Sequence, residues 1–347
     1  MSKEPKKRVN KVFKFTEYTS EQRKTYINTE HSYKTYLELF HRYNKSFRYK
    51  MIWNKANGHE YLYRECYDTK KRVSLGRRSE KTEQIIKSFK EQKSELKTSL
   101  KKYKELLKKQ SKLCKFEKIN RVPNVLVNML RAINQYGLDD KIVIIGTNAL
   151  YAYEARCGVF MEDEHLATYD IDIFNKREKK ISVALKTKLP QKTLKAILLD
   201  TDKTFKKSTE APYRFYNDDG VVVEIITQIA KQQTNQDDFS GVLNLEIDGI
   251  KWLRSSELYK VMVIGGNGIC ANMSTIHPLE YAIYKYWLGK HERKDYMKKE
   301  RDINQSTLVT ELIKEYMPHI DVKKDAKNIQ NIAYSAIEEY LSFGRIV

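Results

Sequence analysis

The stretch Lys141-Ile-Val-Ile-Ile-Gly-Thr147 decides how this chain can fold. Its four consecutive β-branched residues form a short apolar run, which predicts a buried strand that ends at Gly146. Helical periodicity precedes it at residues 125–136 and follows it at residues 148–156. A glycine after a buried strand lets the backbone approach a phosphate, and the hydroxyl of Thr147 and the start of the next helix offer donors. The sequence therefore predicts a phosphate-binding turn.

Acidic residues occupy two later strands. Asp170 and Asp172 are two residues apart in an expected strand, so both carboxylates point to one face. They repel one another unless a cation lies between them, which favours an Mg²⁺ site. Glu224 lies in a strongly β-branched run, where an unpaired charge is costly. Asp218 and Asp219 stay open as alternatives for this third acid, although their sequence is typical of a turn.

The order of these features resembles the nucleotidyltransferase superfamily typified by DNA polymerase beta. In that family an apolar residue, a glycine and a small residue precede an acid–apolar–acid pattern, and a third acid follows on a later strand. Ile145-Gly-Thr147, Asp170-Ile-Asp172 and Glu224 match this pattern in order. The amino-acid sequence of residues 145–174 is similar to those of an uncharacterised bacterial branch of nucleotidyltransferase-like proteins. The resemblance extends over roughly residues 60–315.

The resemblance implies metal-dependent transfer of a nucleoside monophosphate from a nucleoside triphosphate (NTP) to a hydroxyl group. Asp170, Asp172 and Glu224 would hold two Mg²⁺ or Mn²⁺ ions, and either Asp172 or Glu224 would be the general base. Gly146 and Thr147 would contact the β- and γ-phosphates. Cations on the C-terminal helices would also contact the nucleotide: Lys285, Lys290 and Arg301.

The positive charge is concentrated in one part of the chain. The formal net charge is +20, and the residues before 121 carry 19 of these charges, with 33 Lys and Arg against 14 Asp and Glu. This asymmetry predicts that residues 1–118 contact a polyanion, RNA or DNA. The preferred case is tRNA, because the chain distantly resembles nucleotidyltransferase toxins of phage-defence and toxin–antitoxin systems that modify tRNA. A merely solvated lysine-rich surface is the alternative.

The expected fold is α/β, a mixed β-sheet core with helices. Residues 1–78 are interpreted as a basic N-terminal module, a helix at 19–50 followed by a β-hairpin, with residues 1–15 disordered. The aromatic residues of this module either stack on bases or form its core. The remaining expected parts are a long amphipathic helix at 79–118, the nucleotidyltransferase core at 119–250 and a mostly helical C-terminal domain at 251–347.

Other functions remain open on the same residues. An Asp-x-Asp pattern also occurs in glycosyltransferases that hold a nucleotide sugar through a metal, and a short motif can be a plain pair of strand residues. The chain could also be an inactive nucleic-acid-binding protein with a nucleotidyltransferase fold. The retained acids argue against this, because buried unpaired acids are unfavourable without a metal.

Cysteine spacing and hydropathy predict the compartment. The four cysteines lie far apart without a Cys-x-x-Cys pair, which predicts a reduced protein without structural zinc. No apolar segment approaches the ~20 residues of a membrane span. The N-terminal residues also lack the apolar run of a secretory signal. We therefore expect a cytoplasmic protein with no membrane contact, whose oligomeric state the sequence does not predict.

Overall fold

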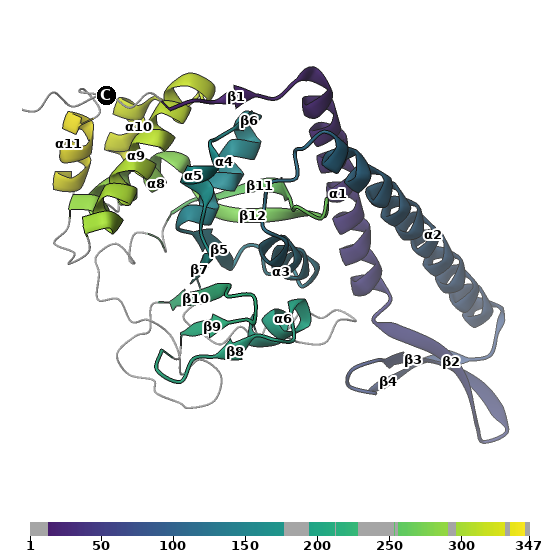
Figure 1. Ribbon diagram of the computed structural model, residues 1–347. Coiled ribbons are helices and arrows are strands. Elements are labelled where there is room, and N and C mark those ends of the chain that lie inside the picture. The colour runs from purple at the N-terminus through teal and green to yellow at the C-terminus, as the bar shows by residue number, and fades with distance from the viewer. Residues whose placement is uncertain are drawn as a thin grey trace, which may run out of the picture.

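A five-stranded mixed sheet lies at the centre of the structure (Figure 1). The computed structural model describes residues 13–176, 194–211, 213–227, 253, 256–290, 296–329 and 334–343. The strand order is β5-β7-β10-β9-β8, in which only β7 and β10 pair in parallel. The structure thus confirms the predicted mixed sheet. The strands are β5 Ile142–Ile145, β7 Asp170–Asn175, β8 Lys206–Lys207, β9 Arg214–Tyr216 and β10 Val222–Thr227.

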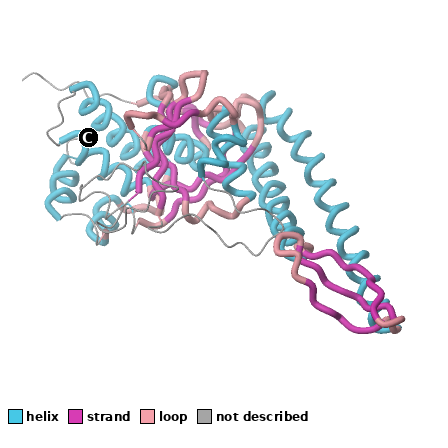
Figure 2. Tube along the Cα trace, turned by 90° about the horizontal axis from the view of Figure 1, so that it is seen from below, coloured by secondary structure: helices cyan, strands magenta, loops and turns pink. Residues whose placement is uncertain are grey.

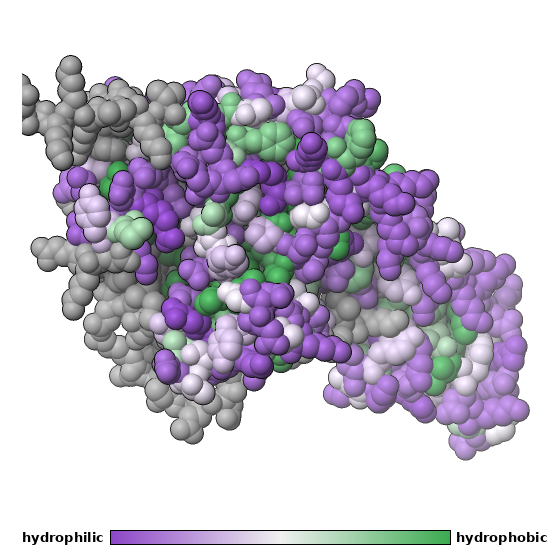
Figure 3. Space-filling view, viewed as in Figure 1, coloured by the Kyte–Doolittle hydropathy of each residue, from purple (hydrophilic) through white to green (hydrophobic). Residues whose placement is uncertain are grey.

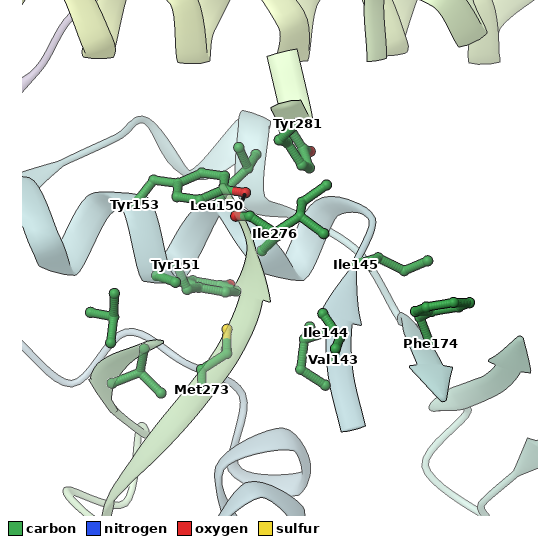
Figure 4. Close-up of a cluster of buried hydrophobic side chains, with 14 of the residues drawn as sticks. Val143, Ile144, Ile145, Leu150, Tyr151, Tyr153, Phe174, Met273, Ile276 and Tyr281 are labelled. Atoms are coloured by element: carbon green, nitrogen blue, oxygen red, sulfur yellow. Dashed lines mark hydrogen bonds between the residues drawn. The ribbon is translucent and has the colours of Figure 1, made fainter. Parts of the chain in front are cut away.

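A hairpin of two strands, β11 (Leu258–Ile264) and β12 (Cys270–Ile276), extends the buried core beside β5. The Thr275 hydroxyl donates to the Ile144 carbonyl at 2.7 Å, which joins β12 to β5, the terminal strand of the five-stranded sheet. Figure 4 shows Met273 and Ile276 of β12 next to the β5 side chains. The helices that pack around these strands include α3 Asn124–Gln135, α4 Leu150–Cys157 and α6 Leu194–Thr201.

The C-terminal helices gather at one end of the molecule (Figure 1). The buried cluster of the sheet continues into them through residues such as Tyr281 and Leu312, which are fully buried. The predicted helical pattern from Pro278 onward is confirmed in the described residues, while the domain boundary at 250/251 stays a prediction. No described helix has the length and apolarity needed to cross a membrane. The C-terminal helices are α8 Pro278–Lys290, α9 Tyr296–Tyr316, α10 Val322–Asn328 and α11 Tyr334–Phe343.

A long arm projects from the other side of the core (Figures 1 and 2). We use this name for residues 20–116, which form two helices side by side with a small sheet at their far end. Both helices begin with a capping box, at Thr19 and at Ser79. The arm contains α1 Ser20–Ser46, β2 Tyr49–Ala56, β3 His59–Cys66, β4 Arg72–Arg77 and α2 Glu80–Phe116.

The arm confirms the predicted helices and hairpin and corrects one boundary. The first helix was expected to run to Lys50, but it ends at Ser46 and β2 follows from Tyr49. β2 pairs with β3, so the predicted hairpin is part of a three-stranded sheet. The aromatic and β-branched content of β2, with Ile52 and Trp53, favours a strand over further helix.

The aromatic residues of α1 form packing contacts. Tyr33 is fully buried, and Tyr36 is nearly so. They belong to a second apolar cluster that joins the arm to the β11–β12 hairpin. Base stacking by these two rings is therefore excluded, and for Tyr33 and Tyr36 the interpretation as core residues is confirmed. The cluster contains residues of α1, α2, β11 and β12, among them Leu107, Cys114, Met262 and Cys270.

A strap of residues 13–17 runs from the C-terminal helices to the start of the arm. The Phe13 amide donates to Glu311 of α9 at 3.4 Å, and the Phe13 ring packs edge-on against His165. Further along, β1 (Thr16–Glu17) pairs with β6 (Val159–Phe160). The expectation that residues 13–15 are disordered is therefore wrong, because their aromatic side chains find apolar partners. Residues 1–12 lie outside the described part.

Candidate active site

Three carboxylates share one face of the central sheet. Asp170 and Asp172 lie two residues apart on β7, and Glu224 of β10 is directly opposite Asp172 in the parallel register. Neighbouring residues of paired strands point to the same side of a sheet. Ile171 and Val223 point to the other side and are buried, while Asp170 is exposed and Asp172 and Glu224 are partly exposed. The predicted acids are thus brought together beside solvent.

The turn at Gly146 holds Asp172 from the side of β5. Ile145, the last residue of β5, pairs with Asp172. Gly146 follows with φ 69° and ψ −157°, a combination that is essentially restricted to glycine. A Cβ atom at this position would stand 2.1 Å from the Asp172 Oδ2 atom. The carboxylate therefore lies against the glycine backbone, in space that any side chain would fill.

Asn148 supports Asp170 from the same turn. Its Nδ2 atom donates to the Asp170 carbonyl at 2.7 Å, and its side chain is almost completely buried. Within the described residues its Oδ1 atom has no hydrogen-bond partner. In the sequence Asn148 stands only at the start of an expected helix, and its contact with Asp170 is not predictable because Asp170 lies 22 residues away.

Glu224 has a cationic partner on the neighbouring strand. Arg214 of β9 pairs with Glu224 in the antiparallel register. The Arg214 Nε and Nη2 atoms both donate to Glu224 Oε1, at 2.9 and 2.5 Å. The charge of Glu224 is therefore compensated by an arginine that the sequence analysis did not consider. Asp218 lies in the β9–β10 turn and pairs with Lys206 at 3.1 Å.

The surroundings of Asp172 oppose its negative charge. Its pKa is raised to about 6, chiefly by burial and also by the nearby Glu224 and Asp170 carboxylates, while the positive charges of Lys285 and Arg301 lower it. A carboxylate in this position gains from a bound cation, and carboxylate oxygens are the ligands that Mg²⁺ prefers. Asp170, Asp172 and Glu224 offer oxygens of this kind, although within the described residues their ligand atoms do not all lie within 4.8 Å of one another.

The raised pKa of Asp172 gives a test by pH in metal-free buffer. The folded protein binds a proton at Asp172 more tightly than the unfolded chain, so the free energy of unfolding should fall as the pH rises from about 4 to about 6. Asp172→Asn cannot titrate and should lack this component. Urea denaturation of both proteins in EDTA at several pH values measures the difference. The free energy of unfolding of the wild type minus that of Asp172→Asn should therefore fall with pH. If this difference stays constant or rises with pH, the pKa of Asp172 is not raised in the folded protein.

The other predicted contacts lie around this turn and on the C-terminal helices. Thr147 is buried, and its hydroxyl accepts a hydrogen bond from Gln305 of α9 at 3.0 Å. Lys285 is also buried and forms an ion pair with Asp302 at 2.8 Å. Lys290 and Arg301 are exposed. Lys285 and Arg301 both act on Asp172 electrostatically, whereas Lys290 lies over the Tyr286 ring.

The buried position of Lys285 predicts a large effect on stability. Lys285→Met leaves the Asp302 carboxylate buried without its ammonium partner, which should lower the free energy of unfolding by about 3–5 kcal/mol. Lys290→Met on the same helix is the control and should change it by less than about 0.5 kcal/mol. Chemical denaturation measures both. Equal stability of the two variants would show that the ion pair is unimportant.

Other possible metal ligands lie at the short helix α5 (Asp163–Leu166). Among the described residues, Glu162, Glu164 and His165 form a group whose ligand atoms are all within 4.8 Å of one another. His165 contacts Phe13 of the strap, and the two glutamates are exposed. Exposed acidic groups of this kind are common without a metal. The carboxylates on the sheet face remain the stronger candidates.

The central and C-terminal parts of the chain match a known family. A family model described as nucleotidyltransferase matches residues 124–331, a segment that includes the Gly146 turn, all three acids and helices α8 and α9. No curated protein and no solved structure matches this chain.

Proposed function

Because the chain belongs to this nucleotidyltransferase family over more than half of its length, we propose that it transfers a nucleoside monophosphate from an NTP to a hydroxyl acceptor. The acceptor oxygen forms a bond to the α-phosphorus, and the bond from that phosphorus to the bridging oxygen breaks. The hydroxyl proton passes to a base and pyrophosphate leaves. The observation that carries the proposal is the set of acids on one sheet face beside the Gly146 turn.

The acids are proposed as the metal site. Asp170, Asp172 and Glu224 would hold Mg²⁺ or Mn²⁺, which supplies Lewis-acid stabilisation of the negative charge on the phosphates. Asn148 holds the backbone of Asp170, and Arg214 holds Glu224 in one orientation. Such partners commonly fix the direction of carboxylate ligands. Asp172 or Glu224 would accept the proton of the attacking hydroxyl.

The triphosphate is proposed to lie against the turn that follows β5. Gly146 is partly exposed there, and its neighbour Thr147 keeps one hydroxyl proton to donate while its oxygen accepts from Gln305. Lys290 and Arg301 are exposed cations that could compensate phosphate charge. Lys285 would act at a distance, through its effect on the charge of Asp172, because Asp302 already occupies its ammonium group.

The acceptor is proposed to be a nucleic acid that residues 1–118 bind. These residues supply 19 of the 20 net positive charges, most of them from the arm, whereas the remainder of the chain is nearly neutral. A strong positive field of this kind attracts polyanions and steers them to a surface. RNA, including tRNA, is the acceptor class to test first.

A second candidate is an inactive nucleic-acid-binding protein with the same fold. The Arg214–Glu224 pair favours it, because Glu224 already has a positive partner in the structure. Asp172 speaks for an enzyme, since its raised pKa reflects a carboxylate that lacks sufficient compensation. The two functions differ in one measurable result, the covalent transfer of label.

The test is incubation of the protein with each labelled NTP in turn, Mg²⁺, and total cellular RNA or total cellular protein. Label in the RNA fraction that depends on Mg²⁺ and on the protein supports the complete proposal. Label in the protein fraction keeps the transfer reaction but overturns the nucleic-acid acceptor. No label in either fraction with any NTP, at any Mg²⁺ or Mn²⁺ concentration, overturns the transfer reaction and favours the binding protein.

A further inference from the structure

Helix α2 carries an unusual set of charges. Its 37 residues include 12 lysines and five glutamates, with neither arginine nor aspartate. At 100° per residue, six of the lysines fall within an arc of about 80°. Ser94 is the only other residue between positions 90 and 112 on this arc. We call these lysines the lysine stripe: Lys90, Lys97, Lys101, Lys104, Lys108 and Lys112.

The stripe faces solvent. The opposite side of α2 packs on α1, where Gln110 donates to the Asn28 carbonyl and the Ser32 hydroxyl, both at 3.0 Å. Leu107 and Cys114 are buried on that side. All six stripe lysines are exposed, and the visible surface of the arm is largely hydrophilic (Figure 3). The stripe is therefore accessible along its full length.

Few acids compensate the stripe. Glu105 lies at its edge and pairs with Lys108 at 2.9 Å. In the described part of the chain, no ion pair joins the other five stripe lysines to an acid. Glu91 and Glu95 lie on the neighbouring face of the helix, about 100–140° from Lys90. The positive charge of the stripe is thus available to a ligand.

We propose that the lysine stripe binds the phosphate backbone of a double-helical nucleic-acid segment without reading its sequence. The stripe spans about 33 Å along a straight helix, close to one turn of a duplex. A duplex offers one phosphate charge per about 1.7 Å of its axis, a density that matches a row of point charges. Lysine ammonium groups contact phosphates and carry little information about bases.

The composition of the stripe also argues against other ligands. Unpaired bases bind by stacking on aromatic side chains, and the stripe has none. A membrane surface is bound by a helix that also inserts apolar residues, whereas the apolar face of α2 is occupied by α1. The stripe therefore suits a rigid anionic rod. This inference rests on the proposed nucleic-acid acceptor and specifies how it is held.

The test compares two triple variants with equal change in net charge. Lys97→Glu/Lys101→Glu/Lys104→Glu removes the middle of the stripe. The control variant changes exposed lysines elsewhere on the same helix: Lys81→Glu/Lys102→Glu/Lys109→Glu. Circular dichroism establishes that both variants fold. The ligand is a fluorescent blunt 20-base-pair RNA duplex of arbitrary sequence, and anisotropy is measured against salt in EDTA without NTP.

For the wild-type protein, the logarithm of the binding constant should fall linearly with the logarithm of the salt concentration. In the stripe variant this slope should be less steep by about 2.7, because three phosphate contacts are lost. At low salt the stripe variant should bind about a hundredfold more weakly, whereas the control variant should lose less than about tenfold. Equal losses in both variants would overturn the stripe as the site. Tighter binding of single-stranded RNA, or of anionic lipid vesicles, would overturn the duplex as the ligand.

The same protein separates this inference from the proposed function. Asp172→Asn should bind the duplex as tightly as the wild type, since the acids are not needed for docking. If the duplex binds at the stripe but no NTP labels any acceptor, the stripe stands and the transfer reaction fails. If label is transferred while the stripe variant binds the duplex normally, the reaction stands and the stripe fails.

Discussion

Asp172→Asn should lower the rate of nucleotidyl transfer by at least about a thousandfold. The substitution removes the negative charge between Asp170 and Glu224. The asparagine side chain has the same shape as the aspartate and fits the same place against Gly146. Metal ions contribute several kcal/mol to stabilising the charge of such a reaction, and each ~1.4 kcal/mol is a factor of ten in rate. The initial rate of label transfer measures the effect with the NTP that the wild type uses best.

Asp218→Asn is the matched control for this result. Asp218 lies on the same sheet, in the β9–β10 turn, and pairs only with Lys206 among the ion pairs of the described residues. Its substitution should leave the rate within about twofold, as expected for an exposed ion pair. Activity of Asp172→Asn within tenfold of the wild type would rule out this acid as part of the catalytic site. Loss of activity in Asp218→Asn would instead restore it as the third acid.

Gly146→Ala should lower the rate of nucleotidyl transfer nearly as much as Asp172→Asn does. It should also destabilise the protein. The new methyl group would stand 2.1 Å from Asp172 Oδ2, so the carboxylate must leave its position. The backbone at Gly146 also has a positive φ of 69°, which costs an alanine about 1–3 kcal/mol. Label transfer and chemical denaturation measure the two effects separately.

Gly58→Ala separates backbone strain from the loss of the site. Gly58 has φ 75° in the β2–β3 turn, and nothing lies within 4 Å of an added Cβ atom. This variant should lose a similar part of its stability but keep its transfer rate. If Gly146→Ala stayed as active as Gly58→Ala, the close contact between Gly146 and Asp172 would have no catalytic meaning.

The local part of the site could be predicted from the sequence. The buried strand before Gly146 and the alternation at Asp170 and Asp172 depend on neighbouring residues, and their patterns have a clear physical cause. The register between β7 and β10, in contrast, could not be predicted from the sequence. The position of Glu224 opposite Asp172 follows from the parallel pairing of β7 and β10, which are separated by more than 40 residues.

The supporting contacts could not be predicted, because each joins residues of ordinary appearance that lie on different elements. Gln305 donates to Thr147 across 158 positions, and Arg214 lies on a strand of only three residues. Lys285 illustrates the opposite case. The family resemblance implied that Lys285 contacts the nucleotide, whereas the structure shows it in a buried ion pair with Asp302. Only the packing of α8 against α9 shows whether Lys285 contacts a nucleotide or forms a buried ion pair.

The contact between the arm and the β11–β12 hairpin has a consequence for synthesis on the ribosome. The Tyr26 hydroxyl donates to the Met262 carbonyl at 2.6 Å, 236 residues later in the chain. At typical rates of translation, the apolar side of the arm waits on the order of tens of seconds for this cover. The arm is thus synthesised well before the hairpin that completes its packing. A nascent chain that ends at residue 118 contains α1 and α2 but lacks Met262 and Cys270, the hairpin residues that complete this apolar cluster.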